Sequence, residues 1–282
     1  YNESETLPHV IRIALQGLAE HYPGAKSVIV AAGSPEGEAA LRSAEEVPEN
    51  PAIKRIQFVF RDELINGKGW SIRAIFEIAD KLGADAVILE ADLRSDVQNG
   101  TAVGLTPDWI RLLMEPIRTR EMDMVVSRFT RYYLEAPVST LSYPLFTAIY
   151  ECPIRRMTGG QWGISHNLLD IYFQRFHHAW QAEVAGYGVD SWLATVAITA
   201  NARICVANLG IKIHRPLAAK REVVLRQVAS VLFGQIKLDQ DWWLKKGQLY
   251  SVPMFRPLPI FGIPQKAAPP PVEHAPKVMI WK

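Results

Sequence analysis

The sequence predicts an α/β fold: a mostly parallel β-sheet with helices on both faces and a smaller, mixed C-terminal part. Two observations predict it. Apolar runs of strand length alternate with amphipathic helical patterns through residues 1–127, and glycine-rich or acidic turns follow several of the apolar runs. Alternating strands and helices favour a parallel sheet, because each crossover helix covers one of its faces. Ligands of such sheets bind at the carboxyl ends of the strands, which is where these turns lie.

The expected elements of the first half follow one another along the chain. Thr6 can cap a helix whose apolar stripe runs from Leu7 to Leu18. A sheet of this kind normally begins with a strand, and none precedes this helix, so we expect a further segment upstream of Tyr1. The other expected helices span residues 38–46, 71–82 and 107–118, and the expected strands, all in one sheet, span residues 27–32, 56–60, 86–90 and 122–127.

The second half is a mixture of elements. Helices are expected over residues 138–151, 191–200 and 217–237, and a strand over residues 202–207 that leads to the Ile211–His214 segment. From Ser251 the chain is rich in proline, which is typical of an arm outside the core. We therefore divide the chain into residues 1–127, residues 128–237 and a C-terminal arm over residues 238–282.

Composition and charge exclude several classes of function. The chain has 282 residues, 49% of them hydrophobic and 21% charged, which is typical of a globular protein. A net charge of +2 is too small to favour nucleic acid as a partner. No apolar run reaches the ~20 residues of a membrane span. Cys152 and Cys205 form no CxxC pair, so neither a disulfide framework nor a zinc site is indicated, and we expect a soluble protein in the reducing cytoplasm.

Acidic residues follow the third expected strand. Asp92 and Glu90 come directly after an apolar run, and carboxylates there suit a hard cation such as Mg²⁺ or Mn²⁺, which also takes substrate phosphates as ligands. The alternative is a strand that simply exits into solvent. His214 also lies at a strand end and could supply an imidazole ligand, although a lone histidine more often caps or donates a hydrogen bond.

Three glycine turns could bind an anion or a sugar. Gly67-Lys68-Gly69 opens a helix, where free backbone N–H groups and the lysine charge suit a phosphate. Gly33-Ser34 follows a strand and could act in the same way. Gly159-Gly160-Gln161 lets a ligand approach the backbone. Asp190 could accept hydrogen bonds from sugar hydroxyls, or it could be an ordinary helix N-cap. Each turn could also be plain chain reversal.

Taken in order, these motifs resemble GT-A glycosyltransferases, whose fold is Rossmann-like. The likeness is to retaining glucosyl-phosphoglycerate synthases and mannosylglycerate synthases and covers roughly residues 1–235. The motifs that carry it are Tyr1-Asn2-Glu3, Gly33-Ser34, Gly67-Lys68-Gly69, Glu90-Ala91-Asp92, Gly159-Gly160-Gln161, Tyr187-Gly188-Val189-Asp190 and Asn208-Leu209-Gly210 with His214-Arg215.

The resemblance implies a role for each part of the chain. Residues 1–127 would bind a nucleotide-sugar donor, UDP-glucose or GDP-mannose, and residues 128–237 would bind a small polar acceptor, glycerate-like acceptors included, and complete the metal site. A homodimer is compatible with the resemblance. The implied residues are Asp92 and His214 for Mg²⁺ or Mn²⁺; Glu3, Gly33, Ser34, Gly67, Lys68, Asp92 and Gly160 for the donor; Asp92, Asp190 and Gln161 for catalysis; and Arg131, Tyr132 and Gly159 for the acceptor.

Other functions stay open at this point. The leading hypothesis is transfer with retention, in which the acceptor hydroxyl attacks on the face that the diphosphate leaves. An inverting transferase would instead use Asp190 as general base. Ala31-Ala32, where many relatives carry acidic residues, would also suit a nucleotide-sugar-binding protein without turnover. A nucleotidyltransferase shares the sheet architecture and needs a glycine-rich basic loop after its first strand.

Overall fold

A five-stranded sheet forms the centre of the molecule in the computed structural model, which describes residues 3–61, 67–130, 137–179, 183–214, 221–249 and 260–262. Its strand order is β10-β8-β6-β7-β3. β7 runs antiparallel to both of its neighbours, whereas the other pairs that we describe, β6 with β8 and β8 with β10, are parallel. The strands span Ala86–Ile88 (β3), Met124–Thr130 (β6), Trp162–Ile164 (β7), Ile204–Ile211 (β8) and Ile260–Phe261 (β10).

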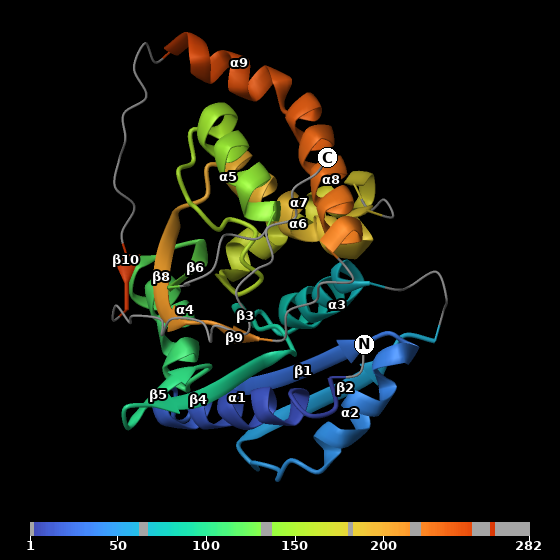
Figure 1. The fold of residues 1–282 in the computed structure, drawn as a ribbon, viewed down its shortest axis with the longest axis vertical. Coiled ribbons are helices and arrows are strands. Elements are labelled where there is room, and N and C mark those ends of the chain that lie inside the picture. The colour runs from blue at the N-terminus through green and yellow to red at the C-terminus, as the bar shows by residue number, and fades with distance from the viewer. Residues whose placement is uncertain are drawn as a thin grey trace, which may run out of the picture.

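The first two strands form a separate sheet. β1 (Ser27–Gly33) and β2 (Ile53–Val59) pair in parallel, in register from Ser27 with Ile53 to Gly33 with Val59. Helices α1 (Leu7–His21) and α2 (Glu38–Glu45) lie beside them at one end of the molecule (Figure 1). The expectation of one continuous sheet was therefore wrong, because β1 and β3 are not hydrogen-bonded to each other and an apolar cavity separates them.

A third, three-stranded sheet links the two halves of the chain. β4 (Leu93–Gln98) turns back into β5 (Thr101–Gly104), and it also pairs with β9 (Ile213–His214). In this pairing Leu93 lies opposite His214. The segment after β3 is thereby held against a segment about 120 residues later in the chain.

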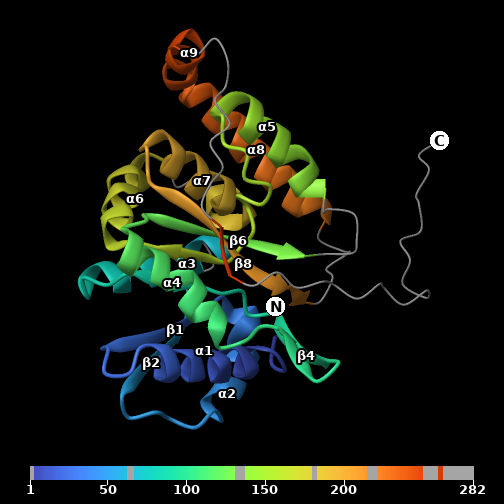
Figure 2. The same cartoon turned by 90° about the vertical axis from the view of Figure 1, so that its left-hand side faces the viewer.

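Helices cover both faces of the central sheet, as the sequence predicts (Figure 2). α4 (Asp108–Arg120) buries Trp109, Leu113 and Ile117 against one face. The larger apolar core lies on the other face, where Trp162, Trp192 and Phe76 are almost fully buried. The helices that build this second layer are α3 (Lys68–Lys81), α5 (Pro137–Tyr150), α6 (His166–Ala179), α7 (Val189–Thr199) and α8 (Arg221–Leu238).

The C-terminal part contains a helix and a short strand. Helix α9 (Gln240–Leu249) follows α8, and Ile260–Phe261 returns to the sheet as β10, at the edge formed by β8. A π-helical turn over Val184–Gly188 precedes α7, and a short 3-10 turn over Pro35–Gly37 follows β1. Both cysteines are buried free thiols. None of the helices in the described ranges is long and apolar enough to cross a membrane.

Close packing of α4 on β7 yields a stability prediction. A Cβ atom on Gly163 would collide with the backbone carbonyl of Leu113, so we expect Gly163→Ala to lower the free energy of unfolding by about 1–3 kcal/mol through overpacking. The matched control is Gly234→Ala in α8, where a Cβ meets open space and alanine favours the helix by up to about 1 kcal/mol. Urea unfolding measures both, and equal stability of the two variants would contradict this packing.

Candidate active site

Asp92 and His214 meet because β4 pairs with β9. Asp92 directly precedes Leu93, whose partner in the pairing is His214. The distance between Asp92 Oδ2 and His214 Nδ1 is 3.6 Å. Two strand ends that are far apart in sequence are thus brought to one point at the carboxyl edge of the sheet.

This pair fits a divalent cation. The other carboxylate oxygen, Asp92 Oδ1, is buried and has no hydrogen-bond partner among the described residues. A buried, unpaired carboxylate oxygen is costly unless an ion or a donor satisfies it. One carboxylate and one imidazole at this separation can share a single ion, provided that ligand oxygens supply the remaining positions.

A partly buried cluster of four charged side chains lies beside the pair. Lys68 Nζ is 3.2 Å from Glu90 Oε1 and 2.9 Å from the Asp190 carboxylate. Lys212 Nζ donates to the second oxygen of Glu90. The order Asp190, Lys68, Glu90, Lys212 therefore alternates in sign, and the four charges sum to zero.

Gln161 and its glycine turn complete the surroundings of Glu90. The Gln161 amide donates to Glu90 Oε2 at 2.7 Å, and its carbonyl oxygen accepts from Lys212 Nζ at 3.2 Å. Gly160 has φ +84°, and a Cβ there would collide with the Glu90 carboxylate. Glycine is needed at this position for both reasons. Gly159 O lies 3.5 Å from Lys212 Nζ, so the whole turn is built round the same two charges.

The N-terminus of α3 is held by a second close approach. Gly67 has φ +116°, and a Cβ on it would lie 2.6 Å from Ala185 O in the π-helical turn. This contact sets Lys68, the first residue of α3, beside Asp190 in the first turn of α7. Lys68 Nζ also lies 5.5 Å from the centre of the Trp162 ring. The N-cap of α7 is Gly188, so Asp190 is not the cap that one interpretation of the sequence gave it.

Burial and neighbouring charges shift the pKa values of these groups. Burial alone would raise the pKa of Glu90, but Lys212 and Lys68 outweigh it and hold that pKa well below its usual range. Burial would lower the pKa of Lys68, yet Asp190 and Glu90 keep it above its usual value. Burial raises the pKa of Asp190 to about 6, Glu90 adds to the rise, and Lys68 offsets part of it. At pH 7 Lys68 and Glu90 are thus charged, and Asp190 is mostly ionised.

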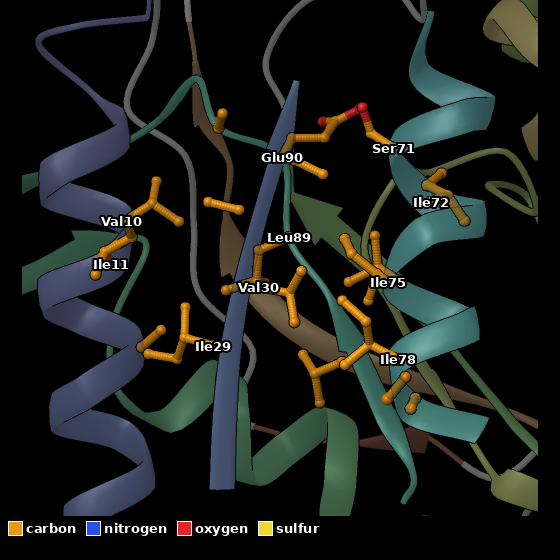
Figure 3. A pocket seen from close by; sticks show the side chains of 18 of the residues that line it. Val10, Ile11, Ile29, Val30, Ser71, Ile72, Ile75, Ile78, Leu89 and Glu90 are labelled. Atoms are coloured by element: carbon orange, nitrogen blue, oxygen red, sulfur yellow. The ribbon is translucent and has the colours of Figure 1, made fainter. Parts of the chain in front are cut away.

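A cavity of about 1230 Å³ opens beside these residues, between β1, β3, α1 and α3. Its mouth is polar and its interior is apolar; in Figure 3 Glu90 and Ser71 lie at one end, and Val30, Ile75 and Leu89 lie further inside. The predicted donor residues that line it are Glu3, Gly33, Ser34, Gly67, Lys68 and Asp92.

Most of the predicted residues come together in space. The donor residues of the first half share the cavity, and His214 contacts Asp92. Asp190 belongs to the charge cluster, and Gly160 and Gln161 lie against its Glu90. The acceptor residues Arg131 and Tyr132 lie outside the described residues. Whether these residues bind a donor and catalyse transfer stays a prediction.

Lys212 is the residue that the sequence analysis missed. Its side chain is only 5% exposed and contacts Glu90, Gln161 and the turn at Gly159. The signal was present: a lysine stands between Ile211 and Ile213 in an otherwise apolar run. A charge there must be paired, because an isolated buried ammonium is very unfavourable. No sequence rule says with which carboxylate.

The chain is similar to known proteins in its fold and not detectably in its sequence. No family model matches the sequence, and no curated protein matches it. Among solved structures, the chain is similar to glucosyl-3-phosphoglycerate synthase from Mycobacterium tuberculosis. The complex with Mn²⁺, UDP and phosphoglyceric acid is 18% identical, with a TM-score of 0.60 over 83% of this chain and 75% of the synthase.

Two further complexes of that synthase give the same result. The one with Mg²⁺ and UDP is 18% identical, with a TM-score of 0.60 over 84% of this chain and 76% of the other. The one with Mn²⁺, UDP-glucose and glycerol 3-phosphate is 19% identical, with a TM-score of 0.57 over 84% and 77% of the two chains. The expected GT-A fold is confirmed.

The raised pKa of Asp190 makes stability depend on pH. Between its usual pKa near 3.8 and about 6, the folded state holds a proton on Asp190 that the unfolded state has released, so stability falls as pH rises through this window. The full effect is about 3 kcal/mol. We expect wild type to lose stability relative to Asp190→Asn by this order between pH 4 and pH 6.5. Urea unfolding of both proteins measures it, and a constant difference would contradict the raised pKa.

Proposed function

We propose that the chain is a metal-dependent transferase that moves glucose from UDP-glucose to a small polar acceptor with retention of configuration. The observation that carries this proposal is the Asp92–His214 pair, with its unpaired buried carboxylate oxygen, at the mouth of a cavity on a GT-A fold. UDP is favoured over GDP because the similar synthase structures hold UDP or UDP-glucose. A homodimer and a cytoplasmic setting stay predictions.

Asp92 and His214 would hold Mg²⁺ or Mn²⁺ together with the oxygens of the donor diphosphate. When bound, such an ion neutralises the charge that develops on the leaving diphosphate. Glu90 is an unsuitable ligand, because both of its oxygens are engaged by Lys68, Lys212 and Gln161. The two acids of the Glu90-Ala91-Asp92 motif would then have different roles: Glu90 would hold the surrounding side chains in place, and Asp92 would bind the metal ion.

The charge cluster would orient the transferred sugar. Asp190 is mostly ionised at pH 7 and can accept hydrogen bonds from sugar hydroxyls, and Gln161 is held in the same cluster by its hydrogen bond to Glu90. Lys68 holds the Asp190 carboxylate at 2.9 Å. This ion pair offsets part of the basicity that burial gives Asp190 and engages its carboxylate, which supports attack by the acceptor on the leaving-group face without a protein base.

Inversion is the second candidate, and one observation favours it. A pKa of about 6 is near the optimum for a general base at neutral pH, so Asp190 could deprotonate the acceptor instead. The configuration of the product separates the two. Proton NMR of the product formed from UDP-glucose with 3-phosphoglycerate, glycerate or glycerol 3-phosphate would show an α-linkage under retention and a β-linkage under inversion.

The metal role gives the first test. We expect Asp92→Ala and His214→Ala each to lower turnover by at least ~100-fold with little change in melting temperature, because they remove stabilisation of the leaving group and leave the core intact. The readouts are UDP release with Mn²⁺ and Mn²⁺ binding in the presence of UDP.

The control uses a second group of side chains that could bind a metal ion. Asp80, His166 and Asp170 could hold an ion among themselves but lie at the far end of α3, so Asp80→Asn with Asp170→Asn should change neither turnover nor UDP-dependent Mn²⁺ binding. If the Asp80→Asn, Asp170→Asn variant loses turnover and Mn²⁺ binding while Asp92→Ala stays active, the assignment of the metal to Asp92 and His214 is wrong.

The donor pocket gives the second test. Lys68→Met leaves the buried cluster with one net negative charge, which opposes a diphosphate at the mouth of the cavity. We expect UDP-glucose with Mn²⁺ to bind about tenfold more weakly or worse, in line with about 1.5–3 kcal/mol for a charged contact. Lys26→Met is the control, because Lys26 is exposed and lines the same cavity at its other end. Calorimetry measures both; equal affinities would contradict the pocket.

A further inference from the structure

Lys212 contacts three separate segments of the chain. It lies between β8 and β9, and its side chain is almost fully buried. Its ammonium group donates to Glu90 after β3 and to Gln161 directly before β7, and it lies 5.5 Å from the centre of the Phe129 ring in β6. Lys68 lines the cavity, whereas Lys212 does not. A ligand in the cavity would therefore meet Lys212 only indirectly, through the side chains that Lys212 holds.

The side-chain amide of Gln161 has two ends of opposite hydrogen-bonding character, and its neighbours select between them. Gln161 is fully buried. Its Nε2 donates to Glu90 Oε2 at 2.7 Å, and its Oε1 accepts from Lys212 Nζ at 3.2 Å. A carboxylate can only accept hydrogen bonds, and an ammonium group can only donate them. The reversed amide would place oxygen against the carboxylate and N–H against the ammonium group, so these two neighbours allow one orientation.

Lys212 also contacts the backbone that carries this amide. Gly159 O lies 3.5 Å from Lys212 Nζ, and Gly160, with φ +84°, lies against the Glu90 carboxylate. Two successive glycines give a turn more conformational freedom than other residues would. The contacts of Lys212 with both the backbone and the side chain of this turn restrict that freedom.

We infer that Lys212 is a positioning residue for the transferred sugar, because it fixes the Gln161 amide in one orientation and holds the turn that carries it. The inference rests on the proposed function, in which Gln161 faces the sugar. A group that is already ordered before the reaction assists the chemical step, since little reorganisation remains. The two lysines that share Glu90 then have different roles: Lys68 acts at the donor pocket, and Lys212 acts on the chemical step through Gln161.

Four proteins separate this role from a plain effect of charge: wild type, Glu90→Gln, Lys212→Met and the variant with both changes. The row keeps a zero sum in wild type and in the double variant, gains one positive charge in Glu90→Gln, and has one net negative charge in Lys212→Met. Methionine is close to lysine in length but cannot donate a hydrogen bond, whereas glutamine at position 90 can still accept one from Gln161. The presence of Lys212 and the net charge therefore vary independently.

We expect turnover at saturating UDP-glucose, measured as UDP release with Mn²⁺, to fall at least about tenfold in both proteins without Lys212. The affinity for UDP with Mn²⁺ should instead follow the net charge of the row, because UDP carries the diphosphate and no sugar. Lys54→Met is the control: Lys54 is an exposed residue of β2, and its replacement should change neither quantity.

Two kinetic outcomes would overturn the inference: turnover that follows the net charge, or a loss in Glu90→Gln as large as that in the double variant. Melting temperatures show which variants are folded. If Lys212→Met alone does not fold, the comparison of the double variant with Glu90→Gln still decides, because the double variant leaves no unpaired Glu90 carboxylate.

Nuclear magnetic resonance tests the positioning without a substrate. The side-chain N–H signals of Gln161 are identified by their loss in Gln161→Met. We expect their exchange with solvent to be at least about tenfold faster in the two proteins without Lys212 than in wild type and Glu90→Gln. Unchanged exchange would show the inference to be wrong. If exchange behaves as expected but wild type releases no UDP from UDP-glucose, the proposed function fails, whereas the ordering of Gln161 by Lys212 is confirmed.

Discussion

The alternating row of partly buried charges, Asp190–Lys68–Glu90–Lys212, is the interaction on which the rest of the site depends. Each member comes from a different element: α7, α3, the segment after β3, and the link between β8 and β9. Removal of one of these charges would leave its neighbour unpaired in a partly buried position, which lowers stability, so the paired row favours the close approach of these elements. Gly67 and Gly160 satisfy the same constraint, since each lets a backbone come closer than a Cβ would allow.

The pairing within the row determines which carboxylate next to it stays available to a ligand. Glu90 is fully used by its two lysines and Gln161, which leaves Asp92 as the motif's carboxylate with an unpaired oxygen. The pairing of Leu93 with His214 then sets an imidazole 3.6 Å from the other oxygen of the Asp92 carboxylate. Under the proposed function, Glu90 would thus stabilise the structure and Asp92 would bind the ion, two residues further along the chain.

Sequence patterns predicted the features that depend on neighbouring residues in the chain, namely the strands and the turns that follow them. Apolar runs bounded by turns located β1, β3 and β6 within a few residues, and the acidic and glycine turns pointed to the carboxyl edge, because side chains at strand ends must meet there. Lys212 was missed since only tertiary contacts supply its partner. The single sheet was wrongly expected because strand pairing is a long-range property: no local signal shows whether β1 reaches β3.

The cavity and the candidate active site share one edge, because Glu3, Ser34 and Asp92 line the cavity near the ends of β1 and β3. Helix α3 connects the two regions. Ile72 and Ile75 line the apolar interior, and Lys68, the first residue of the helix, belongs to the charge row. Packing of the interior against this rigid helix therefore fixes the position of the Lys68 charge, so that core packing and the order of the site are two aspects of one arrangement.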